Sequence, residues 1–155
     1  MAVLVHSSRI QAPLEAVFEF HLDPANLARI QPPGFGVRKL EVPVRIESGA
    51  EIRLAAAAFG WVQAWHVQVE AVLPPHGEPR RAALIDRALA SPFPYFRHRH
   101  EFMEEGGGTW MRDVVDFDPP GGRIGAWFWP GAWLVMKVMF TWRHRRTRRL
   151  LEDGL

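Results

Sequence analysis

Residues 95–117 read YFRHRHEFMEEGGGTWMRDVVDF, in which two strand-like segments flank a run of glycines. This pattern predicts a β-hairpin with its turn at 105–108. If Glu104 pairs with Thr109, one face carries two opposite-charge pairs, Arg97 with Asp116 and Glu101 with Arg112. The other face pairs Phe96 with Phe117, His98 with Val115, His100 with Asp113, and Phe102 with Met111. A slip by one residue would mix the two faces, so the register is well specified and the charged face should point to solvent.

Three polar residues, His98, His100 and Asp113, lie on the otherwise apolar face of this hairpin. A histidine directly opposite an aspartate can hydrogen-bond to it, and the carboxylate then fixes the imidazole tautomer. Three interpretations stay open: a polar pair satisfied within the core, polar groups that line a ligand cavity, and a metal site built on His-x-His plus Asp. Because His-x-His alone is a weak metal signature and no third imidazole is placed, no metal ligand is assigned.

The composition limits the class of protein. The chain has 155 residues, 48% of them hydrophobic and 23% charged, which fits one folded domain, 1–155, and excludes intrinsic disorder. The absence of cysteine excludes disulfides, zinc–thiolate sites and a thiol nucleophile. A net charge of +2 argues against a dedicated nucleic-acid-binding protein. The first ten residues lack the pattern of a secretory signal, so a cytoplasmic location is expected.

Hydrophobic periodicity and turn residues predict the remaining elements. A first strand at 3–11 is followed by two short helices, in PLEAVFEF from Pro13 and in ANLARI after Asp23-Pro24. Further strands are predicted at 37–42, 51–59, 61–73, 82–89, 95–104 and 109–117. In 61–73, large apolar residues stand at the odd positions Trp61, Trp65, Val67, Val69 and Leu73, and polar residues at the even positions His66, Gln68 and Glu70, which indicates one buried face. The default expectation for the large side chains of this region is the core; they are Phe59, Trp61, Trp65 and Met103.

The last part of the chain predicts a long helix at 131–152. The stretch 124–142 is apolar and precedes an arginine cluster, but it has only 19 residues and contains two glycines, a proline and a lysine. We therefore expect a buried helix packed on a sheet rather than a membrane span. One face of the helix carries Trp133, Met136, Phe140, His144, Thr147 and Leu151. Four cations lie off that face; they are Arg145, Arg146, Arg148 and Arg149.

Several segments resemble the START-like superfamily, also called SRPBCC or polyketide cyclase/dehydrase-like, which includes the birch-pollen-allergen-like proteins. They are SSRIQAPLEAVFEF, HLDPANLARIQPP, LIDRALASPFPYFRHRHEF and GTWMRDVVDFDPP, followed by the long C-terminal helix. The resemblance spans nearly the whole chain, and the series Ser-Pro-Phe…His-x-His-x-Phe…Gly-Thr-x-Met-x-Asp is its most specific part. It implies an α+β helix-grip fold, a curved antiparallel sheet of about seven strands around the long C-terminal helix, with two short helices after the first strand.

The resemblance also implies a cavity between sheet and helix that binds lipids, polyketides or other apolar molecules. By matching position, four polar residues recur, Asp86, His98, His100 and Asp113, although the alternation around Asp86 does not fix its face. We therefore expect binding of an apolar small molecule without a cofactor. The apolar wall is expected from Trp65, Val67, Phe102, Met111, Met136 and Phe140.

Two alternatives remain, although a non-catalytic binder is preferred. The first is an enzyme of the cyclase or dehydratase type, in which His100, held by Asp113, acts as general base. The second is an interaction or membrane-adaptor module that contacts an anionic surface through Arg143, Arg145, Arg146, Arg148 and Arg149. The remaining histidines are scattered and expected to be exposed; they are His6, His21, His66 and His76.

Overall fold

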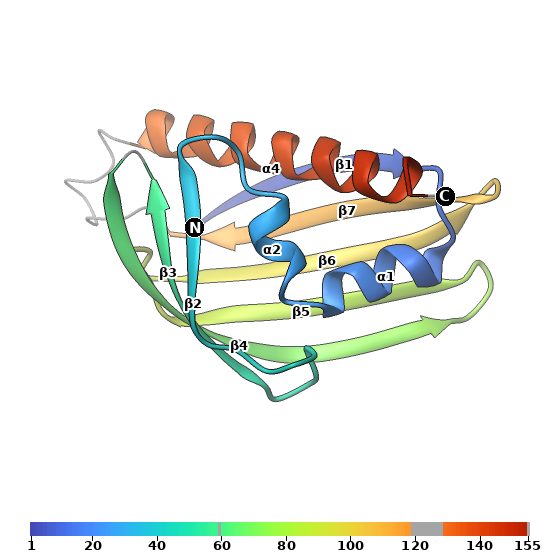
Figure 1. Cartoon of the computed structure of the whole chain (residues 1–155), viewed down its shortest axis with the longest axis horizontal. Coiled ribbons are helices and arrows are strands. Elements are labelled where there is room, and N and C mark those ends of the chain that lie inside the picture. The colour runs from blue at the N-terminus through green and yellow to red at the C-terminus, as the bar shows by residue number, and fades with distance from the viewer. Residues whose placement is uncertain (59, 119–128, 155) are drawn as a thin grey trace.

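A computed structural model describes residues 1–58, 60–118 and 129–154. Its elements are β1 (Ala2–Ile10), α1 (Leu14–Leu22), α2 (Asn26–Arg29), β2 (Phe35–Glu41), β3 (Glu51–Ala58), β4 (Trp61–His76), β5 (Arg81–Ala90), β6 (Phe96–Glu105), β7 (Gly108–Phe117) and α4 (Trp129–Glu152). The strands form one antiparallel, seven-stranded sheet in the order β1-β7-β6-β5-β4-β3-β2. Figure 1 shows the sheet curling around the space in which α1, α2 and α4 lie. The predicted helix-grip α+β fold is confirmed.

The β6–β7 hairpin has the predicted register, with His100 opposite Asp113. In its turn, Gly106 and Gly107 have φ of 55° and 77°, a left-handed conformation that glycine adopts without steric cost. The face predicted to be apolar is buried at Met111, Val115 and Phe117. Because side chains alternate between the two faces of a strand, this register also places His98, His100 and Asp113 on the inner face of the hairpin.

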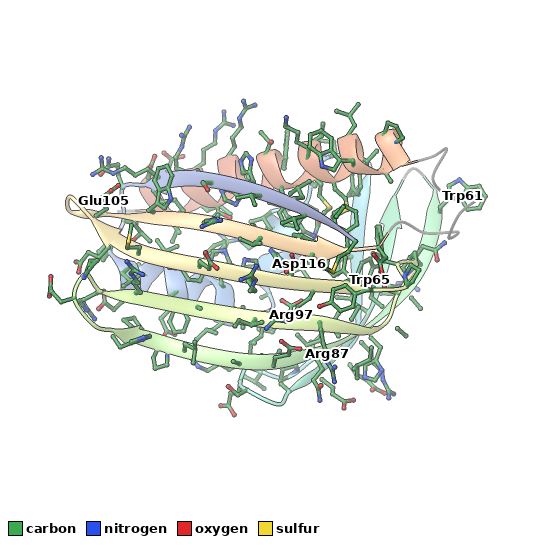
Figure 2. The ribbon with its side chains drawn as sticks, turned by 180° about the vertical axis from the view of Figure 1, so that it is seen from behind. Trp61, Trp65, Arg87, Arg97, Glu105 and Asp116 are labelled. Carbon is green, nitrogen blue, oxygen red and sulfur yellow. The ribbon has the colours of Figure 1, made fainter. Side chains whose placement is uncertain are left out.

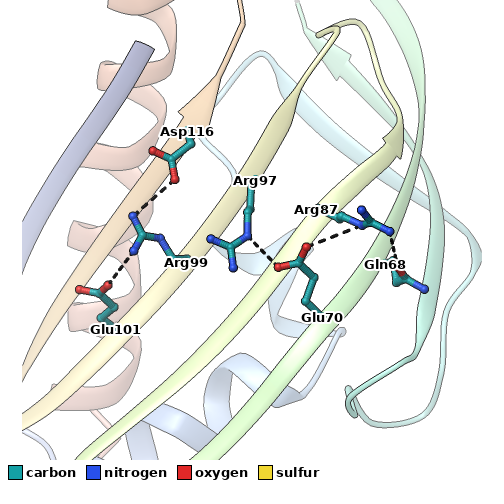
Figure 3. Close-up of polar contacts among 7 residues, drawn as sticks. All are labelled: Gln68, Glu70, Arg87, Arg97, Arg99, Glu101 and Asp116. Atoms are coloured by element: carbon teal, nitrogen blue, oxygen red, sulfur yellow. Dashed lines mark hydrogen bonds and ion pairs between the residues drawn. The ribbon is translucent and has the colours of Figure 1, made fainter. Parts of the chain in front are cut away.

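The charged side chains of Arg97 and Asp116 lie on the outer face as predicted (Figure 2), but they pair with other partners. Arg97 Nε lies 2.7 Å from Oε2 of Glu70 on β4, whereas Asp116 accepts a hydrogen bond of 3.4 Å from Arg99 (Figure 3). Arg97 lies opposite Arg87 on β5, and Arg87 Nε lies 3.7 Å from the other carboxylate oxygen of Glu70. The carboxylate of Glu70 thus lies between two neighbouring cations and relieves their repulsion. The predicted face of Arg97 and Asp116 is confirmed, whereas the predicted ion pair between them is wrong.

The second predicted pair on this face, Glu101 with Arg112, is confirmed, with 3.7 Å between Oε2 and Nη1. Arg99 lies at the same distance from Oε1 of Glu101 and also contacts Asp116 (Figure 3). The outer face therefore carries a band of charged side chains that bridges several strands. Pairs of this kind are partly exposed, and each stabilises the fold by at most about 1 kcal/mol.

Two apolar clusters fill the space between the sheet and the helices. The first packs α1 on the middle strands and includes Leu14, Val17, Phe18, Val69, Leu84, Phe102 and Met111. The second packs α4 on β1 and β7 and includes Leu4, Val115, Phe117, Met136 and Phe140. The alternation within the hairpin predicted its buried residues. The two clusters hold opposite ends of the sheet against different helices.

Strand β4 departs from the predicted alternation at both ends. A register shift lies between Val69 and Ala71, and a bulge of this kind exchanges the two faces of the strand beyond it. Val69 is accordingly buried, whereas Leu73 is 43% exposed. Trp61, at the first position of the strand, is 76% exposed and projects from the sheet (Figure 2). The expectation that Leu73 shares the buried face and that Trp61 belongs to the core is wrong.

The long helix α4 has the predicted faces. Met136, Phe140, His144 and Thr147 are buried, and Arg145, Arg146, Arg148 and Arg149 are exposed. Within the described parts of the chain, no helix is long and apolar enough to cross a bilayer. Phe59 and the part of the apolar stretch that precedes Trp129 lie outside the described residues.

Candidate functional site

A cavity of about 380 Å³ lies between the inner face of the sheet and the helices α2 and α4. Most of its wall is apolar. The wall includes Trp61, at the start of β4, and Val135, near the start of α4, both of which are exposed. The cavity therefore reaches the surface at this end of the molecule. Cavities of roughly this size, about 300–1,000 Å³, are typical of small-molecule sites.

The cavity wall contains all the predicted ligand-binding residues except Phe102. They are Asp86, Trp65, Val67, His98, His100, Met111, Asp113, Met136 and Phe140. Asp86, whose face the sequence did not fix, lies on the inner face opposite His98. Phe102 instead packs against Phe18 and His21, with ring centroids 6.0 and 4.9 Å away, because α1 covers that end of the sheet. The prediction that Phe102 lines the cavity is wrong. That the other residues contact a ligand stays a prediction.

Asp113 is 3% exposed and lies at the centre of three imidazoles. His100 Nδ1 lies 2.7 Å from Oδ1 of Asp113, so the predicted hydrogen bond is present. His144 Nε2, from α4, lies 3.0 Å from Oδ2, and His98 Nε2 lies 3.5 Å from Oδ1. The sequence placed His144 on the buried face of its helix but did not connect it with Asp113. The signal that could have identified this contact was a polar residue on the buried face of the helix, one turn after Phe140.

The hydrogen bonds around Asp113 assign the tautomers of two imidazoles. An ionised carboxylate only accepts hydrogen bonds, so His100 Nδ1 and His144 Nε2 both donate to Asp113. The Nδ1 atom of His144 then accepts from the hydroxyl of Ser8 on β1, at 2.7 Å. A chain of hydrogen bonds thus runs from Ser8 through His144 and Asp113 to His100. In the neutral form of His100, this leaves its Nε2 as the ring's acceptor, and His100 lines the cavity.

Two carboxyls of the wall, those of Asp86 and Asp113, differ in acidity. Burial raises the pKa of Asp113, but the charges of His100 and His98 and the hydrogen bonds from His100 and His144 together hold it well below its usual range. Burial raises the pKa of Asp86 to about 6, against the opposing charge of His100. Neighbouring acids with displaced pKa values in a cavity are typical of functional sites.

Two histidines expected to be exposed lie against this cluster, so that expectation is wrong for His6 and His21. Nδ1 of His21 donates to the carbonyl of Val17 at 2.7 Å, and its ring lies 5.2 Å from that of His100. Burial, and then the charge of His100, lower the pKa of His21 to about 3. His6 packs edge-on against His144, with ring centroids 4.4 Å apart. His21 follows the buried Val17 by one helical turn, and this spacing was the signal that could have predicted its inward position.

Arg143 lies in the cavity wall, which corrects its assignment to the surface arginine cluster. Its Nη2 donates to Oε1 of Gln31 at 3.2 Å, and its guanidinium lies 5.6 Å from the ring centroid of Phe140. Among the described residues, Nε of Arg143 and Nε2 of Gln31 are buried without a hydrogen-bond partner. Burial lowers the pKa of Arg143, against the charges of Asp113 and Asp86. The other four arginines are exposed, and their contact with an anionic surface stays a prediction.

No family model matches the sequence of this chain, and no curated protein matches it either. Solved structures match its fold over nearly the whole length. A protein from Chromobacterium violaceum is 19% identical, with a TM-score of 0.71 over 97% of this chain and 96% of that one. A protein from Thermus thermophilus is 16% identical, with a TM-score of 0.71 over 99% of both chains. A START superfamily protein from Mycobacterium smegmatis is 13% identical, with a TM-score of 0.68 over 99% of both chains. The chain therefore has the fold of START superfamily proteins, as its sequence segments predicted.

Proposed function

We propose that this protein binds an apolar small molecule in the cavity between the sheet and α4. The observation that carries the proposal is a wall that is mostly apolar but contains several polar side chains. They include Asp86, His98, His100 and Asp113 on the inner face of the sheet, and Arg143 with its hydrogen-bond partner Gln31. A concave apolar site with a few convergent polar groups suits an apolar ligand that has one polar end. The START fold is generally associated with hydrophobic ligands, which supports the same proposal.

The polar end of the ligand is an oxygen acceptor that meets Arg143 and Gln31. Each of these side chains has a buried donor without a partner, and leaving such a group unsatisfied costs about 1–3 kcal/mol. A guanidinium binds a carboxylate through two parallel N–H bonds, which few other groups match. A carboxylic acid with an apolar body would satisfy these donors and place its hydrocarbon against Phe140 and Met136.

The test is native mass spectrometry of freshly purified protein, followed by thermal unfolding with dodecanoic acid, its methyl ester and dodecanol. We expect the acid to raise the melting midpoint most, since at equal concentration the ligand with the higher affinity stabilises the folded state more. Arg143→Met should remove the preference for the acid. Arg146→Met, an exposed position on the same helix, should keep it.

The outcomes separate the two parts of this proposal. If nothing co-purifies and none of the three compounds raises the wild-type midpoint, binding of apolar ligands is wrong. If all three raise it equally, the cavity binds apolar ligands but the assignment of an acidic group to Arg143 and Gln31 is wrong.

Acid–base catalysis is a second candidate function, because His100 lines the cavity and is held by the carboxylate of Asp113. An imidazole in this position can remove a proton from an acidic carbon of the ligand, as a cyclase or dehydratase requires. The experiment is incubation of the protein with its extracted ligand, followed by mass analysis. A new product that His100→Gln no longer forms, although it still binds the ligand, would favour catalysis over binding alone.

A further inference from the structure

Three potential metal ligands meet on the inner face of β5 and β6. Asp86 lies directly opposite His98, and His100 follows two residues along the same strand, so all three side chains point to the same face. One ligand atom from each lies within 4.8 Å of the other two. All three residues line the cavity, so an ion among them would be open to a bound molecule.

A second observation points to a missing partner at this place. Nε2 of His98 is buried, lies 3.5 Å from Oδ1 of Asp113, and has no hydrogen bond within the described parts of the chain. The His98 side chain is 7% exposed, so solvent has little access to it. A buried imidazole nitrogen without a partner is unfavourable, and coordination to a cation would satisfy it.

The surroundings of His100 prepare it for coordination. Its Nδ1 donates to Asp113 at 2.7 Å, which leaves the lone pair of Nε2 as the available ligand. Metal-bound histidines commonly donate their other ring nitrogen to a carboxylate, because this fixes the ring and makes the ligand more basic. Asp113 is itself held by His144, and His144 by Ser8, so the support is continuous.

We propose that Asp86, His98 and His100 bind a divalent first-row transition-metal ion, with Zn²⁺ as the probe ion. Two imidazoles and one carboxylate suit Zn²⁺, Fe²⁺ or Co²⁺, whereas Mg²⁺ and Ca²⁺ prefer oxygen ligands alone. Two carboxylates, Asp86 and Asp113, lie within electrostatic range of Arg143, and their negative charge favours a cation at this wall. Bonds of about 2.1 Å hold donors about 3.4 Å apart, so small side-chain rotations would close the site.

An ion at this site has a consequence for the chemistry of His100. Coordination uses the Nε2 lone pair, which His100 would need as a general base, so the two roles exclude each other. The open coordination positions would face the apolar cavity and could bind an oxygen atom of the ligand. A metal would thus polarise the ligand directly, independently of acid–base chemistry by His100.

The test is metal binding by the full chain after treatment with a chelator and its removal. Zn²⁺ is titrated against a competing chromophoric chelator, and Co²⁺ is followed by its visible absorption. We expect one ion per chain and a Co²⁺ spectrum with nitrogen ligands. Asp86→Asn and His100→Gln should each weaken Zn²⁺ binding at least about 100-fold, and circular dichroism would verify that the variants are folded.

His66→Gln is the matched control, because His66 also lies beside a carboxylate, Glu51 at 2.8 Å, but on an exposed pair. It should bind Zn²⁺ as the wild type does. No stoichiometric binding by the wild type, or wild-type affinity in both Asp86→Asn and His100→Gln, would overturn the proposal. Loss of binding in His66→Gln alone would overturn it as well, since the ion would then lie on the surface. None of these results decides the ligand test, which adds no metal and compares thermal unfolding with dodecanoic acid, its methyl ester and dodecanol.

Discussion

Nε2 of His144, on α4, lies 3.0 Å from Oδ2 of Asp113, on β7. The other ring nitrogen of His144 lies 2.7 Å from the hydroxyl of Ser8, on β1. One buried imidazole therefore ties the long helix to both strands beneath it. The apolar contacts of Met136 and Phe140 hold the helix against the sheet. The two hydrogen bonds of His144 in addition fix the rotation of the helix about its axis.

Replacement of His144 by leucine keeps a similar volume but removes both hydrogen bonds. Asp113 then loses one of its donors, so we expect His144→Leu to lower the free energy of unfolding by about 2–4 kcal/mol. The measurement is urea-induced unfolding. Arg145→Leu, the exposed neighbour, should change stability by less than about 0.5 kcal/mol. Equal stability of both variants would mean that the other imidazoles satisfy Asp113 without His144.

The outer face allows a test of which partner Arg97 has in solution. Double-mutant cycles to alanine should give a coupling of about 0.5–1 kcal/mol for Arg97 with Glu70, which lie 2.7 Å apart. The coupling of Arg97 with Asp116 should be near zero, and high salt should weaken the first coupling because both groups are partly exposed. A larger coupling for Arg97 with Asp116 would contradict the arrangement in Figure 3.

The prediction succeeded where a contact depends on register within one hairpin. His100 and Asp113 were placed opposite each other because side chains alternate with a period of two and the glycine turn sets the pairing. Asp116 was paired wrongly because the reach of Arg97 across β5 to Glu70 depends on strands that are distant in sequence. The face of a residue is local information, whereas its partner in a wide sheet is not.

Contacts between helix and sheet could not be derived from periodicity alone. His144 and Arg143 lie on or beside the buried face of α4, but the residues they meet, Asp113 and Gln31, depend on how the helix lies on the sheet. Phe102 shows the complementary limit: alternation predicts that it points inward, but not that α1 covers it and separates it from the cavity.

His21 makes stability depend on pH. Its pKa falls from 6.5 to about 3 in the folded protein, so the unfolded chain takes up the proton first as the pH drops. The contribution of neutral His21 to the free energy of unfolding is thus complete above pH 6.5 and decreases as the pH falls toward 3. Between pH 7 and 4, His21→Leu should lose about 1–3 kcal/mol less stability than the wild type. Phe20→Leu, a non-titrating neighbour, should keep the wild-type slope in the same urea titrations.

Filling the cavity is the most direct test that it holds the ligand. Ala56 on β3 belongs to the wall, whereas its neighbour Ala55 points to the other face, and the two are similarly half-buried. Phenylalanine is well tolerated in strands, so both Ala56→Phe and Ala55→Phe should fold. We expect Ala56→Phe to weaken binding of the fluorescent apolar anion 1-anilinonaphthalene-8-sulfonate at least about 10-fold, because the ring occupies space that the ligand needs. Ala55→Phe should bind as the wild type does. Equal binding by all three proteins would mean that the probe binds elsewhere, and the cavity would then have no support as its site.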